Sequence, residues 1–107
     1  MLLAEFERYV GEQDGPKLQA KVDSLLLAHH RWGQTARFLV LAYWTKGLVD
    51  VPRHEELRHR FRAGITTRAM EQVPGGAAGE VLFFQFIMRE APNANWRLWQ
   101  IRARGTA

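Results

Sequence analysis

The sequence contains no cysteine and a single serine, and both shortages limit the chemistry open to the chain. Without cysteine there is no disulfide, no thiolate nucleophile and no cysteine-bound metal. Ser24 lies within a predicted helix, with no acid or histidine placed to activate it as nucleophilic catalysis requires. We therefore expect a protein that is not an enzyme and that uses neither a cofactor nor a metal.

Long apolar runs are also missing. The longest, Phe38–Trp44, is far shorter than the roughly 20 residues that a membrane-spanning helix needs. No basic region precedes an apolar core at the N-terminus, so no secretory signal is evident. A chain of 107 residues with 47% hydrophobic and 24% charged residues has the composition of one globular domain. We expect a cytoplasmic protein with no membrane partner and no small-molecule substrate.

Charge is unevenly distributed along the chain. The net charge is +4, and residues 1–50 balance six basic against six acidic side chains, so residues 51–107 supply the whole excess. All nine Lys or Arg residues in that second part are arginines. Arginine forms planar, two-pronged hydrogen bonds to phosphates and carboxylates, which favours a nucleic acid or an acidic protein as partner. A genome-wide preference for arginine over lysine is the alternative explanation.

The first half of the chain predicts three helices. Apolar residues three and four positions apart indicate one amphipathic helix over about residues 2–11. A second is expected over about residues 16–31, with Pro16 in its first turn. The apolar run within Thr35–Val49 leaves no wide polar face, which predicts a buried central helix around which the rest of the chain is arranged.

The second half predicts two further helices and a hairpin. A surface helix is expected over Arg53–Arg62, followed by a glycine-containing turn and a short helix over Ile65–Val73. Val81–Met88 and Trp96–Arg104 are rich in β-forming residues and flank turn material, which predicts a two-stranded hairpin. A buried helix over Ala78–Glu90 is the alternative, because a short apolar run fits both periods.

The predicted fold class is α+β: a mostly helical single domain of about five helices with a C-terminal two-stranded β-hairpin. Residues 1–33 would form an N-terminal helical pair, and residues 34–104 a helix-turn-helix plus the hairpin. The order of elements over residues 35–104 resembles that of winged-helix domains, in which the hairpin is the wing. This resemblance implies a regulator that binds DNA.

The same resemblance implies where DNA would bind. The second helix of the motif would enter the major groove, and the hairpin would reach phosphates or the minor groove. The nucleic-acid-binding residues that we predict are Thr66, Thr67, Arg68, Gln72, Arg97, Arg102 and Arg104.

A protein-interaction role is the alternative function: an adaptor, inhibitor or oligomerisation domain that binds an acidic protein. Trp96 and Trp99 are three positions apart on a predicted strand, so we expect them on opposite faces of the hairpin, one of them exposed beside Arg97 and Arg102. An exposed aromatic ring among arginines is typical of an interface centre, which makes both tryptophans predicted interface residues. The competing interpretation is that the helices bury both rings. A free hairpin edge would also allow a homodimer.

Overall fold

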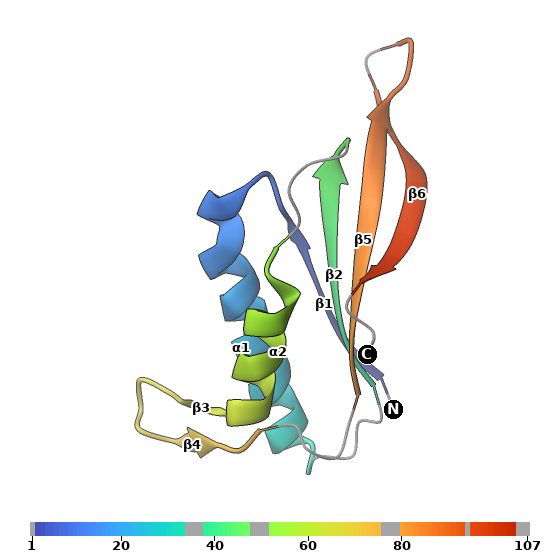
Figure 1. Ribbon diagram of the computed structural model, residues 1–107. Helices are drawn as coiled ribbons and strands as arrows, with labels where there is room; N and C mark the ends of the chain where they lie inside the picture. Colours follow the sequence, from blue (N-terminus) through green and yellow to red (C-terminus); the bar gives the residue numbers. More distant parts are fainter. Residues whose placement is uncertain (1, 34–37, 48–51, 76–79, 94, 105–107) are drawn as a thin grey trace.

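In the computed structural model the chain forms a four-stranded mixed sheet with two helices packed on one face (Figure 1). The structure describes residues 2–33, 38–47, 52–75, 80–93 and 95–104. A short 3-10 turn, Glu12–Asp14, precedes the first helix. In chain order the elements are β1 (Leu2–Arg8), α1 (Gly15–Arg31), β2 (Phe38–Lys46), α2 (His54–Ala63), β3 (Ile65–Thr66), β4 (Gln72–Val73), β5 (Glu80–Glu90) and β6 (Trp96–Arg104).

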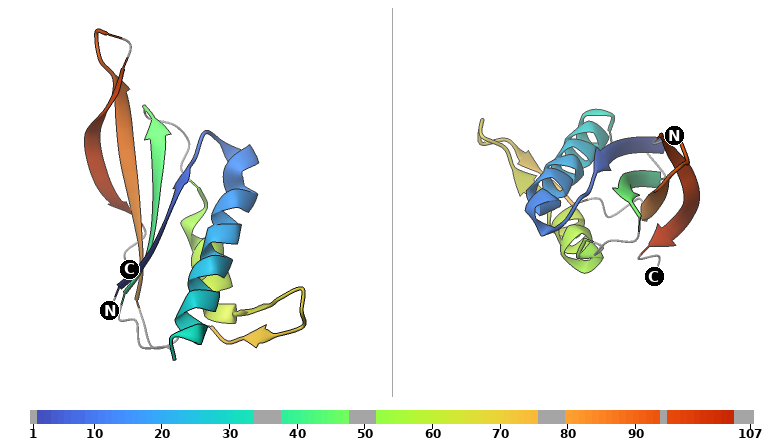
Figure 2. Two further views of the ribbon diagram at one scale, coloured as in Figure 1. Left: turned by 180° about the vertical axis from the view of Figure 1, so that it is seen from behind. Right: turned by 90° about the horizontal axis from the view of Figure 1, so that it is seen from above.

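The main sheet has the strand order β1-β2-β5-β6. β1, β2 and β5 run parallel, and β6 is antiparallel to β5. Parallel neighbours need crossover connections, which α1 and α2 provide. Since both crossovers move the same way across the sheet and share one hand, both helices lie on the same face (Figure 2). Within the described residues, no helix covers the other face.

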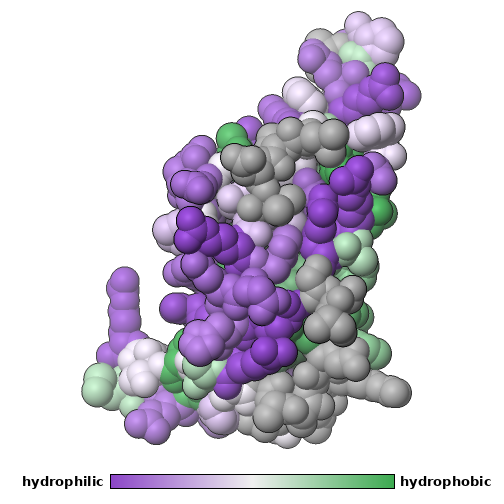
Figure 3. All heavy atoms as spheres, in the orientation of Figure 1, coloured by the Kyte–Doolittle hydropathy of each residue, from purple (hydrophilic) through white to green (hydrophobic). Residues whose placement is uncertain are grey.

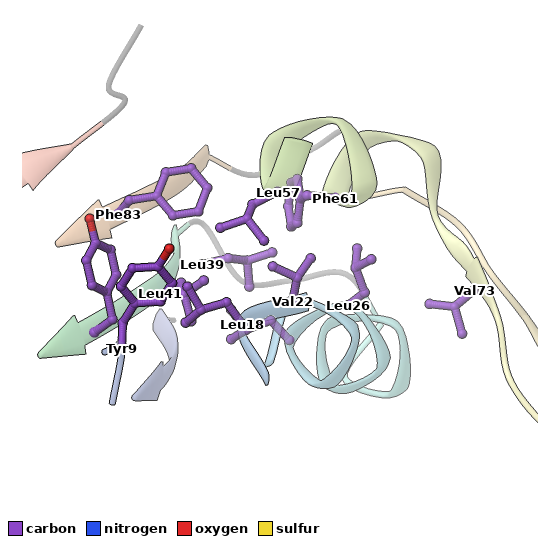
Figure 4. Close-up of a cluster of buried hydrophobic side chains, with 12 residues drawn as sticks. Tyr9, Leu18, Val22, Leu26, Leu39, Leu41, Leu57, Phe61, Val73 and Phe83 are labelled. Atoms are coloured by element: carbon purple, nitrogen blue, oxygen red, sulfur yellow. The ribbon is translucent and has the colours of Figure 1, made fainter. Parts of the chain in front are cut away.

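The core lies between the two helices and the sheet (Figure 4). The helices bury residues at spacings of three and four, which are Leu18, Val22, Leu25 and Leu26 on α1 and Leu57 and Phe61 on α2. The sheet contributes alternate residues of its two central strands, which are Leu39, Leu41 and Tyr43 on β2 and Phe83 and Ile87 on β5. Each of these five strand residues is 0% exposed, so this face of the sheet is completely covered along its centre.

Two polar contacts hold the helices in place. The carboxylate of Asp14 accepts a hydrogen bond from the backbone N–H of Val10 at 2.7 Å, which joins the end of β1 to the start of α1. This bond is the main reason that the pKa of Asp14 is lowered. On the other side of α1, Arg60 of α2 donates two hydrogen bonds of 2.6 and 2.8 Å to Asp23. A two-pronged pair of this kind fixes orientation as well as distance.

The prediction of a mostly helical chain with about five helices is wrong, because the described residues contain two α-helices and a four-stranded sheet. The residues expected to form the first helix form β1 instead. The described part of the expected central helix is β2, while its ends, at residues 34–37 and 48–51, lie outside the described residues. Parallel strands are buried on both faces and so carry continuous apolar runs that mimic a buried helix.

The short helix expected over Ile65–Val73 is also absent. β3 and β4 pair antiparallel there and form a small hairpin. Gly64 adopts a φ of 79°, and a Cβ at this position would collide with the carbonyl oxygen of Val73, so glycine permits the close return of the chain. Without this helix the described residues contain no helix-turn-helix, and the winged-helix resemblance does not hold.

Three elements are confirmed. The helix predicted over residues 16–31 is α1, and that predicted over residues 53–62 is α2. The C-terminal hairpin is formed by β5 and β6, which excludes the alternative of a helix over Ala78–Glu90. Neither helix in the described part of the chain is long and apolar enough to cross a membrane.

Candidate functional site

The face of the sheet that points away from the helices, which we call the open face, carries mostly apolar side chains. Successive side chains of a strand point to opposite faces, so the residues between the core positions form this second face. Strand pairing places on it Leu2, Ala4, Phe6, Arg8, Phe38, Val40, Ala42, Trp44, Lys46, Leu82, Phe84, Phe86, Met88, Glu90, Trp96, Leu98, Ile101 and Ala103. Only three of these side chains, Arg8, Lys46 and Glu90, are charged.

Large apolar side chains on the open face remain accessible to solvent. Leu2 is 57% exposed, Leu98 and Ile101 are each 53% exposed, and Phe6 is 47% exposed. Strands about 4.8 Å apart, each seven or more residues long, give the face a footprint of roughly 500 Å². Figure 3 shows hydrophilic residues over most of the side formed by the helices, with hydrophobic residues in view along the margin beside β6. This size is within the range of the largest apolar patch on a monomer, and such a patch is often functional.

Side chains on the open face are ordered by contacts with one another. The rings of Phe6 on β1 and Phe86 on β5 meet over β2, with centroids 5.3 Å apart. The guanidinium of Arg8 lies 5.2 Å from the ring centroid of Trp44. These contacts hold the large rings in fixed positions, which lowers the entropy cost when a partner covers them.

Trp96 and Trp99 do not follow the expected alternation. The pairing of β5 with β6 shifts between Ile87 and Met88, which leaves Trp99 as the extra residue of a β-bulge. Trp96 is 40% exposed and Trp99 is 51% exposed, so neither ring belongs to the core. Both line one hollow of about 260 Å³, whose other walls include Lys46, Met88, Arg89 and Glu90. The expectation of opposite faces assumed an unbroken strand, and the bulge at Trp99 interrupts the alternation on which it depended.

The bulge also determines where the hairpin arginines lie. Arg97 pairs with Arg89, Arg102 with Gln85 and Arg104 with Phe83. Gln85 and Phe83 are buried on the helix side of the sheet, and so is Ile87, two positions before Arg89. All four arginines therefore share that side. We call Arg89, Arg97, Arg102 and Arg104 the arginine row. In an unbroken strand, Arg97 would point away from Arg102 and Arg104.

One end of the arginine row is anchored to the interior by a chain of hydrogen bonds. Arg104 donates two bonds, of 3.0 and 3.1 Å, to the side-chain oxygen of Gln85. The amide nitrogen of Gln85 donates to the hydroxyl of Thr45 at 3.1 Å, and this hydroxyl donates to the carbonyl oxygen of Gly47. These hydrogen bonds fix Arg104 in one orientation while leaving part of its guanidinium unused.

Beside this anchor lies a pair formed by Tyr43 and His54. The Tyr43 hydroxyl and His54 Nε2 are 2.9 Å apart. Burial, together with the positive charges of Arg104 and Arg58, lowers the pKa of His54 to about 4. The imidazole is therefore neutral at pH 7, mainly because burial disfavours its charged form.

The other predicted nucleic-acid-binding residues lie elsewhere. Thr66 is in β3, Gln72 is in β4, and Thr67 and Arg68 are in the turn between them rather than on a recognition helix. The β3–β4 hairpin lies on the opposite side of the molecule from β6 (Figure 1 and Figure 2). The predicted residues therefore form two separate groups, and only the three hairpin arginines lie together.

The hydroxyl of Ser24, the single serine, is engaged by the helix backbone, and metal-binding clusters are missing from the described residues. The hydroxyl of Ser24 donates a hydrogen bond of 3.1 Å to the carbonyl oxygen of Ala20 on an exposed part of α1. Within residues 2–33, 38–47, 52–75, 80–93 and 95–104, no group of three histidine, aspartate or glutamate residues is placed to hold a metal ion. The two surfaces on the sheet are thus the candidate sites of this chain.

Comparison with known protein families, with curated proteins and with solved structures finds no match to this chain.

Sequence reasoning missed the open face because it assigned β1 and β2 to helices. A signal for strands was present in Ala4, Glu5, Phe6 and Glu7, where apolar and acidic residues alternate. In the structure Glu5 and Glu7 point to the helix side, where Glu5 pairs with Lys21 of α1 at 3.4 Å. Phe6 points to the open face.

Proposed function

We propose that this chain is a non-catalytic oligomerisation module in which the open face packs against the open face of a second copy. The observation that carries the proposal is the open face itself, an apolar surface that no described element covers. Three of its four strands are parallel, and parallel sheets normally have both faces covered. A second copy of the chain would cover the open face without the need for any other protein.

The size of the open face supports a dimer. Its footprint of roughly 500 Å² underestimates the accessible surface, because side chains project from the sheet. A stable interface buries about 800 Å² on each partner, and small interfaces bury less than about 600 Å². Pairing two open faces therefore gives an interface at or near the standard size. The result would be two sheets packed about 10 Å apart, with the helices on the outside.

The charges on the open face favour an antiparallel arrangement of the two copies. Arg8, Lys46 and Glu90 all lie towards the carboxyl ends of β1, β2 and β5. A two-fold axis that crosses the strands places these charged ends at opposite ends of the dimer. Like charges then do not meet, and the apolar centres of the two faces contact each other. The small side chain of Ala42 and the large rings of Phe6 and Phe86 make the open face uneven. The same face of a symmetric partner can fit this uneven surface.

Sedimentation equilibrium over a series of protein concentrations tests this proposal. The chain of 12.4 kDa should have twice that mass at high concentration. The double variant Phe6→Gln plus Ile101→Gln removes two exposed apolar side chains from the open face without changing charge. It should raise the dimer dissociation constant by at least about tenfold, because each side chain contributes about 1.5 kcal/mol or more when buried.

The matched control is Met70→Gln, which changes a side chain that is 78% exposed but lies on the β3–β4 turn. This variant should dimerise like the wild type. A wild-type chain that stays monomeric at every concentration would contradict the proposal, and so would equal weakening by the control. Circular dichroism of each variant checks that the fold is retained.

A further inference from the structure

The arginine row lacks the counter-charges that other arginines of the chain have. Arg31, Arg53, Arg58 and Arg60 each lie within 4.0 Å of a carboxylate. Among the described residues, no carboxylate lies within this distance of any member of the row. Arg89 and Arg97 even face each other directly across two strands, and like charges in this arrangement destabilise a sheet. An anion bound outside the chain would relieve this repulsion.

The shape of the row fits a linear anion. On β5, Phe83 pairs with Arg104, Gln85 with Arg102 and Arg89 with Arg97. The four arginines are therefore spread over roughly 20 Å along the strand. Arg89 and Arg97 are exposed, and Arg102 and Arg104 are half-buried. A planar guanidinium forms two parallel hydrogen bonds to a phosphate, and the anchoring of Arg104 leaves some of its donors available.

An exposed aromatic ring lies beside the row. Trp99 is 51% exposed, and the guanidinium of Arg89 lies 5.8 Å from its ring centroid. Proteins that bind single-stranded nucleic acids combine a basic track for the backbone with aromatic rings on which bases stack. In a duplex the base faces are already stacked, so an exposed ring favours a single strand, and the competition with polyglutamate described below distinguishes a single strand from an acidic peptide. We infer that the arginine row binds the phosphate backbone of a single-stranded nucleic acid, with a base stacked on Trp99.

This inference does not depend on the proposed dimer. The row lies on the helix side of the sheet, whereas the dimer would use the open face. A second copy on the open face leaves the four arginines accessible, and a monomer would expose them equally. Trp99 shares a hollow with Trp96 and Met88 of the open face, so the dimer affects at most the stacking of the base. Failure of one proposal therefore leaves the other standing.

Fluorescence anisotropy with a labelled oligothymidylate, measured over a series of salt concentrations, tests the inference. Binding should weaken steeply as salt rises, because each neutralised phosphate releases counterions. The double variant Arg97→Gln plus Arg102→Gln should lower the slope of log affinity against log salt by about 1.4, or about 0.7 for each phosphate that is no longer neutralised. Trp99→Leu should weaken binding about tenfold because the base no longer stacks, with little change in the salt slope.

The matched control is Arg62→Gln plus Arg68→Gln, which removes the same charge from two exposed positions outside the row. It should leave the salt slope unchanged. An equal fall in slope for the control, or no binding at low salt, would overturn the inference. Competition by polyglutamate of matched charge that is as strong as competition by the unlabelled oligonucleotide would also overturn it, by indicating an acidic protein as partner.

Discussion

At the scale of single residues, His29 is a core side chain whose polar atoms are buried without hydrogen bonds to any described residue. Its ring is 1% exposed, and neither ring nitrogen has a hydrogen-bond partner among the residues that the structure describes. The pKa of His29 is lowered because burial disfavours the charged imidazolium. The ring is therefore neutral in the folded chain, and the loss of its hydrogen bonds to water lowers the free energy of unfolding.

His29→Leu should stabilise the chain. Removing the unsatisfied nitrogens should raise the free energy of unfolding at pH 7 by about 1–2 kcal/mol. The gain should be larger at pH 5. There the unfolded wild type takes up a proton, whereas the folded ring resists it, so the wild type loses stability as the pH falls below 6.5. Urea unfolding at pH 7 and pH 5, followed by tryptophan fluorescence, measures both effects.

His30→Leu provides the control for this prediction. His30 is the next residue on α1 and is half-buried outside the core, where it lies 3.8 Å from the carboxylate of Glu71. Its replacement should change the free energy of unfolding by no more than about 0.5 kcal/mol at pH 7. If the advantage of His29→Leu over the wild type were the same at pH 5 and pH 7, the explanation from a neutral buried ring would be wrong.

At the scale of elements, β2 is the strand on which the fold depends most. It pairs with both β1 and β5, and Leu41 at its centre is 0% exposed. Leu41→Ala should lower the free energy of unfolding by about 2–5 kcal/mol, since it leaves a cavity under both helices. Val40→Ala, one position away on the open face, should cost less because Val40 is only half-buried. Denaturant titrations of the two variants make the comparison, and equal decreases would show that the helix side does not carry the core.

The helices of this fold were predictable because the information that defines them is local. The stripe of Leu18, Val22, Leu25 and Leu26 repeats at the helical period, and Pro16 lies in the first turn. The C-terminal hairpin was predictable for a similar reason, since its two β-rich segments flank residues that favour a turn. In each case the residues that decide the structure lie close together in sequence.

β1 and β2 were not predictable from local patterns because their structure depends on distant partners. The run Phe38–Trp44 suits a buried helix and a buried parallel strand equally, and its pairing with Glu80–Glu90 decides the outcome. The same dependence explains what was missed about the sites. The open face exists only once four strands are aligned, and a single bulge at Trp99 places Arg97 beside Arg102.

At the scale of the whole molecule, the two proposed binding surfaces lie on opposite sides of one sheet. The molecule is elongated, with extents of 48 × 27 × 23 Å, and the β5–β6 hairpin projects beyond the other strands (Figure 1). In the proposed dimer, the open faces are buried between the two sheets and both arginine rows remain accessible. A single long nucleic acid could then contact two rows, whereas a short one reaches only one.

This geometry predicts that dimerisation strengthens binding to long nucleic acids alone, a prediction that rests on both proposals. The wild type should bind an oligothymidylate of about 40 nucleotides at least tenfold more tightly than one of about 10, because the second row binds at high effective concentration. Phe6→Gln plus Ile101→Gln should lose this preference, yet bind the short strand as the wild type does, since the row is intact. Met70→Gln should keep the preference. Anisotropy titrations with both lengths measure the ratio, and an equal ratio in the dimer and in the monomeric variant would show that the two rows do not act together.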